Sequence, residues 1–246
     1  MAEKIPKLQG DTMLNNYAKI LGLSFIITAL IFGAFLVKSR QNQKSLRIVG
    51  YANKQFVSDL VKWNLTIQKN SETGNLSAGY KTLSNDVNSF KKYLVENGLE
   101  ESEISIQPIN SYPMYDNYGR ISSYNLNQNV FIISDKLDKI EQLSLTPDFF
   151  AEKGLLLQMS NLSYLYTKLP DLKKQLLSEA TKDALERAKE VASSAKVRLG
   201  KMREARAGVF QITEPYSTDV SDYGIYNTST RNKSISVTLS AVFDLR

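Results

Sequence analysis

The stretch SISVTLSAVFDL, residues 234–245, alternates apolar and polar side chains almost without a break. The apolar side chains occupy every second position: Ile235, Val237, Leu239, Ala241, Phe243 and Leu245. Their polar neighbours Ser236, Thr238, Ser240 and Asp244 point the opposite way. A period of two is that of a β-strand with one face buried and the other in water. The stretch therefore predicts a long, half-buried strand.

The same alternation recurs earlier in the chain. Over Asp59–Lys69, one face carries Val61, Trp63, Leu65 and Ile67, and the other carries Lys62, Asn64, Thr66 and Gln68. Further strands are predicted at residues 46–52, 103–110, 122–133, 154–167 and 201–213.

Three segments have helical spacing instead. Apolar residues at spacings of four and three form an amphipathic seam that stops at Asn97-Gly98: Leu76, Tyr80, Leu83, Val87, Phe90 and Leu94. A shorter helix is predicted over Lys136–Leu145. A long helix begins near Pro170 and ends by Gly200, and its stripe is mostly alanine: Leu172, Leu176, Ala180, Ala184, Ala188, Val191 and Ala195. Small side chains let this helix lie close to the sheet it covers.

The predicted order is β-β-α-β-β-α-β-α-β-β. Most consecutive strands lack a crossover helix between them, which favours an antiparallel or mixed sheet with helices on one side. The predicted fold class is α+β, with a sheet packed against long amphipathic helices and preceded by one transmembrane helix.

The transmembrane prediction rests on ILGLSFIITALIFGAFLV, Ile20–Val37, which carries no charge. As a helix it is about 27 Å long, close to the thickness of bilayer hydrocarbon. Its large apolar residues are the expected anchor: Ile20, Leu21, Leu23, Phe25, Ile26, Ile27, Leu30, Ile31, Phe32, Phe35, Leu36 and Val37. A signal peptide would have a shorter apolar run and a small-residue cleavage site, so we expect the helix to be retained. The predicted parts are a tail at 1–19, the helix at 20–37, a tether at 38–45 and a soluble domain at 46–246.

Composition argues against enzyme chemistry. The chain has no histidine and no cysteine, which removes His-dependent triads, ordinary zinc sites and the commonest general base. It also lacks phosphate-loop, dinucleotide-binding and nucleophile-elbow motifs. Adjacent Glu100 and Glu101 are expected to be solvated, and Asp59 to cap or turn the chain. We predict no catalytic site, no metal and no cofactor.

The charge balance points to lipid as a partner. Lys and Arg number 31 against 25 Asp and Glu, giving a formal charge of +6. Attraction to anionic headgroups or a solvated surface explains this excess, whereas nucleic-acid binding lacks a compact basic run with interleaved aromatics. Lys4, Lys7 and Lys19 precede the helix and a similar number of charges follow it, so the positive-inside rule gives no orientation.

Tyrosine supplies the strongest contact signal. Seven of the 13 tyrosines fall in two short loop-like regions: Tyr112, Tyr115, Tyr118 and Tyr124, and then Tyr216, Tyr223 and Tyr226. Tyrosine offers a large contact area with a polar tip, which suits interfaces. Three interpretations stay open: the loops cover the edges of their own sheet, they join subunits, or they bind sugar or peptide.

The chain also resembles the SIMPL-domain family (DUF541) over almost all of 46–246. The similar pieces are IVGYA before an Asp-led strand, the helix end LVENGLEESEISIQPI, the segment YPMYDNYGRISSYNLNQNVFI, the helix ATKDALERAKEVASSAKVRLGK and the strand SISVTLSAVFDL. One departure is Ser58-Asp59, where the family often has Pro-Asp.

The resemblance implies a bacterial envelope protein facing the periplasm, loosely linked to stress responses, in a family where some members form ring-like or hollow homo-oligomers. It carries no catalytic residues. It places the N-terminus in the cytoplasm and the domain outside a single-pass inner-membrane anchor. We therefore expect a non-enzymatic protein that self-assembles through its SIMPL domain, with membrane lipid and a further envelope protein as partners and no nucleic acid. The alternative is a monomeric periplasmic module that binds glycan, peptidoglycan or a protein through the tyrosine loops.

Overall fold

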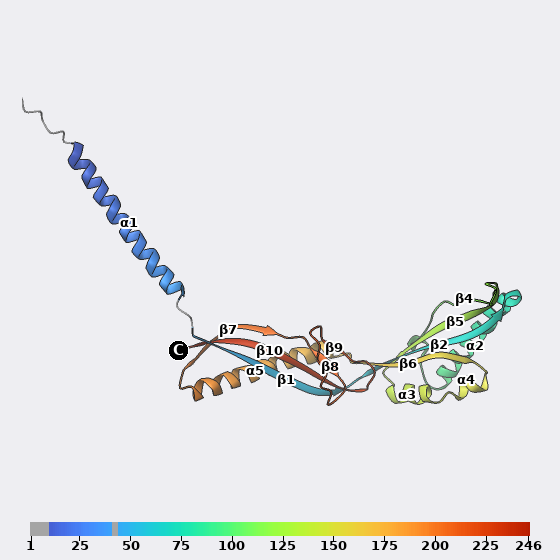
Figure 1. The fold of residues 1–246 in the computed structure, drawn as a ribbon. Coiled ribbons are helices and arrows are strands. Elements are labelled where there is room, and N and C mark those ends of the chain that lie inside the picture. Colours follow the sequence, from blue (N-terminus) through green and yellow to red (C-terminus); the bar gives the residue numbers. More distant parts are fainter. Residues whose placement is uncertain (1–9, 41–43) are drawn as a thin grey trace, which may run out of the picture.

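A computed structural model of the chain describes residues 10–40 and 44–246. It begins with helix α1 (Gly10–Arg40), which projects from one end of an elongated α+β body (Figure 1). The span Lys19–Lys38 is long and apolar enough to cross a membrane, and none of it is buried inside the protein. All twelve expected anchor side chains are exposed on it. The helix runs to Arg40, further than expected, and this shortens the link to the next element.

The body contains two sheets rather than the single sheet expected from the sequence. The first, sheet A, is formed by β1 (Ser45–Val57), β10 (Asn232–Leu245), β7 (Leu199–Ala207), β8 (Gln211–Thr213) and β9 (Ile225–Tyr226). Strand β10 is central: it pairs with β1 along one edge and with β7 and β8 along the other, always antiparallel. The short β8–β9 pair is parallel.

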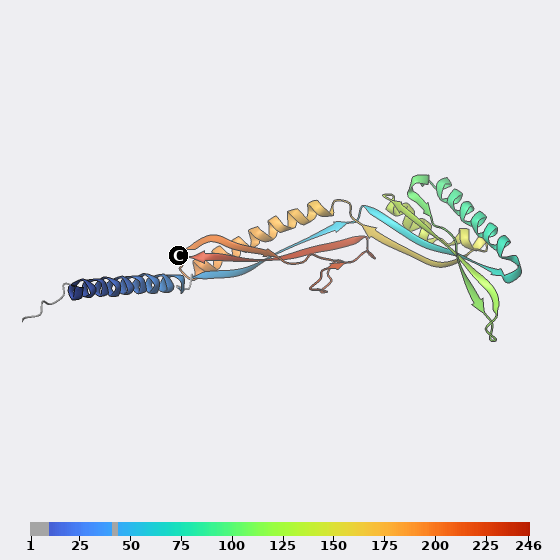
Figure 2. The same cartoon turned by 90° about the horizontal axis from the view of Figure 1, so that it is seen from above.

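Helix α5 (Leu169–Ser194) covers one face of sheet A, as Figure 2 shows. Its buried residues recur strictly every fourth position: Leu172, Leu176, Ala180, Ala184, Ala188 and Ala192. Each step of four advances about 40° beyond a full turn, so the stripe winds around the helix as the sheet beneath it twists. Val191 and Ala195, expected in this stripe from a spacing of three, are exposed instead.

The alanine stripe brings α5 unusually close to β1, as the sequence predicted. The closest point is Gly50, where an added Cβ would lie 2.2 Å from the Ala180 carbonyl oxygen and 2.7 Å from the Ala184 Cβ. One residue on, the Tyr51 amide donates a hydrogen bond to Asp183 Oδ2 on the same helix, at 2.7 Å. This bond and the Arg187 guanidinium lower the pKa of the Asp183 carboxyl.

The second sheet, sheet B, has β2 (Leu60–Glu72) between β5 (Ile121–Ser134) and β6 (Leu156–Leu165), and β3 (Ile104–Ile106) and β4 (Asn110–Tyr115) pair with the other edge of β5. Helices α2 (Leu76–Glu96), α3 (Leu137–Leu145) and α4 (Asp148–Glu152) contribute buried side chains to one core with this sheet. Trp63 of β2 meets Phe90 of α2 edge to face, with ring centroids 5.9 Å apart. The predicted seam of α2 is confirmed, since its Leu83, Val87, Phe90 and Leu94 are buried.

The two sheets follow one another end to end because β1 and β2 do not fold back on each other (Figure 2). Ser58 and Asp59 form the link between β1 and β2. The Ser58 amide donates to the Arg231 carbonyl oxygen at 3.0 Å, and the Asp59 amide donates to the Leu165 carbonyl oxygen at 3.1 Å. Proline at position 58 would lack the first of these donors. The Arg231 guanidinium also pairs with Asp138 and Glu141 of α3, which ties the start of β10 to the second core.

The structure confirms the α+β class and the position of most predicted elements. Two predicted strands are each divided: residues 103–110 contain β3 and only the first residue of β4, and residues 201–213 contain most of β7 and then β8. The region expected as a loop near Tyr112 is the strand β4.

The contact at Gly50 generates a stability prediction. Gly50→Ala should lower the free energy of unfolding by about 2–3 kcal/mol, because the new methyl group meets backbone atoms that cannot rotate away. Urea unfolding of the full chain in detergent would measure it. Adding Ala184→Gly should recover only part of the loss, since the shortest contact is with the Ala180 carbonyl. Gly74→Ala, which meets nothing within 4 Å, is the matched control. Equal stability of the Gly50 and Gly74 variants would contradict the prediction.

Candidate functional site

The first tyrosine group lies on the hairpin formed by β4 and β5, at the end of the body far from α1 (Figures 1 and 2). All six residues of β4 are exposed. The exposed large side chains of the hairpin are Tyr112, Met114, Tyr115, Tyr118 and Ile121. Tyr124 differs from them, because it is partly buried and packs against the core of sheet B. Thus the hairpin end, apart from Tyr124, is not covered by the described part of its own chain.

A tight turn presents this hairpin end. Asp116 Oδ1 accepts hydrogen bonds from the amides of Tyr118 and Arg120, each at 2.9 Å. The Asp116 amide donates to the Arg120 carbonyl oxygen at 2.8 Å, and Gly119 adopts a φ of +75°. Aspartate and glycine at these positions are what such a turn requires. The turn leaves the Tyr118 side chain 87% exposed.

The second tyrosine group lies on sheet A, in the segment that joins β8 to β9. Tyr216 and Tyr223 are 92% and 97% exposed, while Tyr226 in β9 is about half exposed. Gln211 ties the segment to β8: its Nε2 donates to the Ser221 carbonyl oxygen at 2.7 Å. The structure therefore places the two predicted tyrosine groups on different sheets and does not bring them together.

A buried lysine supports this second segment. Lys233 is only 1% exposed, and its Nζ donates to the Asn227 carbonyl oxygen at 2.6 Å. The Asn227 side chain in turn donates to Glu214 Oε2, also at 2.6 Å. Burial lowers the pKa of the Lys233 ammonium to about 8, although the nearby Glu214 carboxylate acts in the opposite direction. Lys233 thus connects central strand β10 to the base of the tyrosine segment.

Sequence reasoning missed Lys233, although a signal was present. Position 233 is in phase with Ile235 and Val237, which point into the core. A lysine in an inward-facing position is uncommon and indicates a specific partner. That partner is a backbone carbonyl brought in from a separate segment, which strand periodicity does not reveal.

Asp59 has a structural role, but it joins two segments that are distant in sequence instead of capping a helix or forming a local turn as expected. Its two carboxylate oxygens accept hydrogen bonds from the amide and the hydroxyl of Thr167, both at 2.7 Å. These contacts hold the β1–β2 link against the connection between β6 and α5. Both carboxylate oxygens are thus engaged in structural hydrogen bonds, although Asp59 also lines a surface pocket with Asp135, Lys136 and Arg231.

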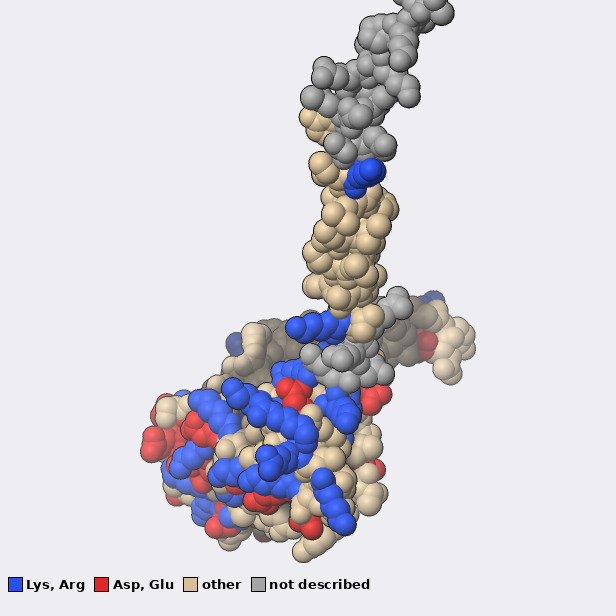
Figure 3. All heavy atoms as spheres, turned by 90° about the vertical axis from the view of Figure 1, so that its left-hand side faces the viewer, with Lys and Arg blue, Asp and Glu red and all other residues tan. Residues whose placement is uncertain are grey.

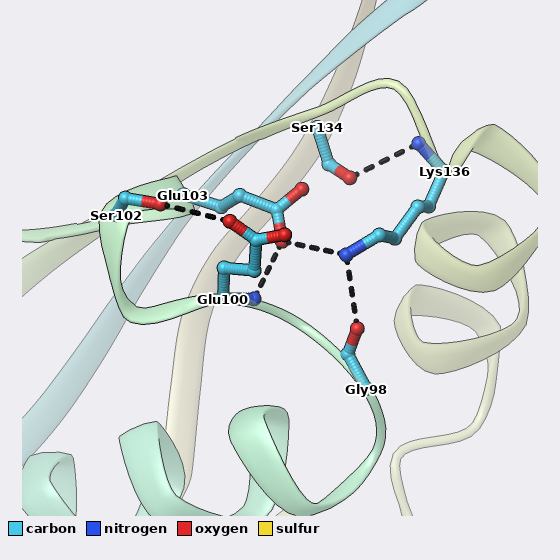
Figure 4. A network of polar contacts seen from close by, with 6 residues as sticks. All are labelled: Gly98, Glu100, Ser102, Glu103, Ser134 and Lys136. Carbon is cyan, nitrogen blue, oxygen red and sulfur yellow. Dashed lines mark hydrogen bonds and ion pairs between the residues drawn. The ribbon is translucent and has the colours of Figure 1, made fainter.

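The acidic cluster after α2 is likewise part of a polar network that joins two elements (Figure 4). Glu100 and Glu103 form a reciprocal capping box around a short 3₁₀ turn, with the Glu100 amide 2.6 Å from Glu103 Oε2. Lys136 Nζ contacts Glu103 Oε2 at 3.2 Å and the Gly98 carbonyl oxygen at 3.0 Å. Burial alone would raise the pKa of Glu103, but hydrogen bonds from Glu100, Ser134 and Lys136 and the Lys136 charge lower it overall. The cluster connects the end of α2 to the start of α3.

The neighbouring Glu101, predicted to be solvated, is exposed and pairs with Lys91 at 2.6 Å. The absence of an enzyme site stays a prediction.

The shifted pKa of Lys233 generates a pH prediction. Between about pH 8 and pH 10.5 the unfolded chain holds a proton that the folded chain has released, so this residue makes the folded state more stable as pH rises. Compared with Lys233→Met, the wild type should gain up to about 3 kcal/mol of unfolding free energy over that interval. Urea unfolding at a series of pH values would measure the difference. A difference between the two proteins that is constant with pH would contradict the assignment.

Comparison with known proteins identifies the family. The family model SIMPL, described as a protein of unknown function (DUF541), matches residues 46–243. This range includes both sheets, apart from the first residue of β1 and the last two residues of β10. No curated protein matches the chain. The match covers well over half of the sequence and agrees with the resemblance noted from the residues. The chain therefore belongs to the SIMPL (DUF541) family.

Proposed function

We propose that this protein is a non-enzymatic, membrane-anchored envelope protein whose SIMPL domain self-assembles into a ring-like or hollow homo-oligomer. The observation that carries the proposal is the apolar end of the β4–β5 hairpin. A strand that is exposed along its whole length and carries Tyr112, Met114 and Tyr115 has a surface suited to another protein chain.

The anchor supports the same proposal. Helix α1 presents a fully exposed apolar surface over Lys19–Lys38, and bilayer hydrocarbon is the natural cover for a surface of that length. Assembly of the domains would gather several such helices beneath them. The family resemblance supports an N-terminus in the cytoplasm, a periplasmic domain at the inner membrane, and a link to envelope stress.

A second candidate function is favoured by the other tyrosine segment. A groove lies between this segment and the uncovered face of sheet A, lined among others by Tyr51, Val209, Val220 and Thr238. A glycan, a peptidoglycan strand or a partner protein bound there would lie beside Asp222, the chain neighbour of the exposed Tyr223. Because the two tyrosine groups are on different sheets, separate substitutions distinguish assembly from ligand binding.

For assembly, the mass of the wild-type protein in mild detergent should be a multiple of the monomer mass. Tyr115→Ser with Tyr118→Ser should shift it to the monomer, because both side chains are exposed and contribute nothing to the core. The control pair Tyr216→Ser and Tyr223→Ser, which is even more exposed, should keep the oligomer. A wild-type monomer at micromolar concentration would refute self-assembly. Peptidoglycan pull-down that is lost only in the control pair would support the second function instead.

Orientation can be tested because the chain has no native cysteine. Asn117→Cys in the hairpin turn should react with a membrane-impermeant maleimide in spheroplasts, since the proposal places the domain in the periplasm. Ala2→Cys should react only after lysis. The reverse pattern would place the domain in the cytoplasm, and reaction of both in spheroplasts would show that the chain does not span the membrane.

A further inference from the structure

The end of the body next to α1 is strongly basic. Three segments that are distant in sequence meet there: the start of β1, the link from α5 into β7, and the end of β10. The Arg198 and Arg246 backbones pair with each other at this end, and the Leu245 amide donates to the Lys44 carbonyl oxygen. Figure 3 looks onto this end and shows many Lys and Arg side chains on it, with fewer Asp and Glu among them. The basic end is defined here by residues 44–47, 196–206 and 244–246.

The net positive charge of the domain is concentrated at the basic end. The basic end contains eight Lys and Arg, against two Asp and Glu: Lys44, Arg47, Lys196, Arg198, Lys201, Arg203, Arg206 and Arg246. The rest of residues 44–246 contains 18 Lys and Arg and 21 Asp and Glu. The formal charges are thus +6 at the basic end and −3 over the remainder. The domain is therefore electrically polarised along its length.

Few of these cations are neutralised locally. Arg203 pairs with Asp244, and Arg206 pairs with Glu204. The other six have no ion pair with a carboxylate in the described part of the chain, and all eight residues are exposed. Exposed cations that are grouped with few counter-charges indicate a surface for an anionic partner.

The position of the basic end selects that partner. Helix α1 ends at Arg40 and β1 starts at Ser45, so their Cα atoms can be at most about 18 Å apart. With α1 in a bilayer, the basic end is held near the headgroups of the leaflet from which the chain emerges. Electrostatic attraction extends over about 8–10 Å at ordinary salt concentrations. Lys38, exposed at the end of the apolar span, adds to the same field.

We propose that the basic end binds anionic lipid headgroups and holds the elongated domain with its β4–β5 hairpin away from the membrane. The inference rests on the membrane anchor in the proposed function, but it does not depend on self-assembly. Each Lys or Arg close to an anionic surface contributes about 1 kcal/mol, which is about a fivefold change in the ratio of docked to undocked domains. Removal of four such charges should reduce this ratio by several hundredfold.

The test uses the full chain in vesicles of phosphatidylcholine, with or without about one third phosphatidylglycerol. Val197→Cys, at the exposed link into β7, carries a membrane-impermeant bimane label attached after reconstitution. A nitroxide on the phosphatidylcholine headgroup quenches the label at close range. Quenching should be several-fold stronger with phosphatidylglycerol present, and about 0.5 M salt, where the Debye length is about 4 Å, should remove the difference. The same label at Tyr118→Cys should show no dependence on lipid composition.

Two matched sets of substitutions decide the outcome. The first neutralises four unpaired cations of the basic end: Lys44→Gln, Lys196→Gln, Arg198→Gln and Lys201→Gln. The second neutralises four lysines beside sheet B, of which Lys81, Lys92 and Lys153 are exposed and Lys139 is partly exposed: Lys81→Gln, Lys92→Gln, Lys139→Gln and Lys153→Gln. Only the first set should abolish the effect of phosphatidylglycerol on the Val197→Cys label.

Equal quenching in both lipids, equal loss in both sets, or lipid-dependent quenching at Tyr118→Cys would overturn the proposal. Failure of the anchor itself is distinguishable, because the chain would then leave the vesicles in an alkaline wash. Failure of self-assembly would leave the quenching result unchanged.

Discussion

The structure depends first on the antiparallel pairing of β1 with β10, which runs without interruption from Ser45 opposite Asp244 to Val57 opposite Asn232. This ladder joins the first strand of the domain to its last. Because the two strands run in opposite directions, the link from α1 and the end of β10 lie at the same end of sheet A. At the opposite end of the ladder, the chain leaves β1 and enters sheet B as β2. The position of the membrane-side surface and the direction of the rest of the body both follow from this one pairing.

The second decisive feature is that the chain passes from β1 into β2 through Ser58 and Asp59 without folding back on itself. The link donates hydrogen bonds to the Arg231 and Leu165 carbonyls and accepts two from Thr167, and these bonds keep the two strands in different sheets. Each sheet then requires its own core, which α5 supplies for one and α2, α3 and α4 supply for the other. The result is a long body with different chemistry at its two ends. Lysine and arginine gather beside the anchor (Figure 3), and the hairpin that carries exposed tyrosine and methionine lies at the distant end (Figure 1).

Most secondary structure could be predicted because its signals are local. Periodic patterns over a few turns or pleats indicate which side chains are buried, as in the alternation of residues 234–245 and 59–69 and in the seam of α2. The alanine stripe even predicted the close approach of α5, which Gly50 makes possible. The error at Val191 has a tertiary cause instead, since the stripe keeps a spacing of four to follow a twisted sheet. Composition was enough to find the two tyrosine groups. It did not predict that most of these side chains are exposed or that the two groups lie on different sheets.

The sequence by itself determined the apolar helix, the strands and helices, the α+β class and the lack of histidine and cysteine chemistry. Only the tertiary structure decided that there are two sheets, that Lys233 is buried against the Asn227 carbonyl, and that three basic segments form one surface. The physical reason is that periodicity reports whether a side chain is buried but not what buries it. Strand partners and charge clusters come from segments far apart in the chain. Their meeting is decided by the pairing of whole strands and the packing of helices on them.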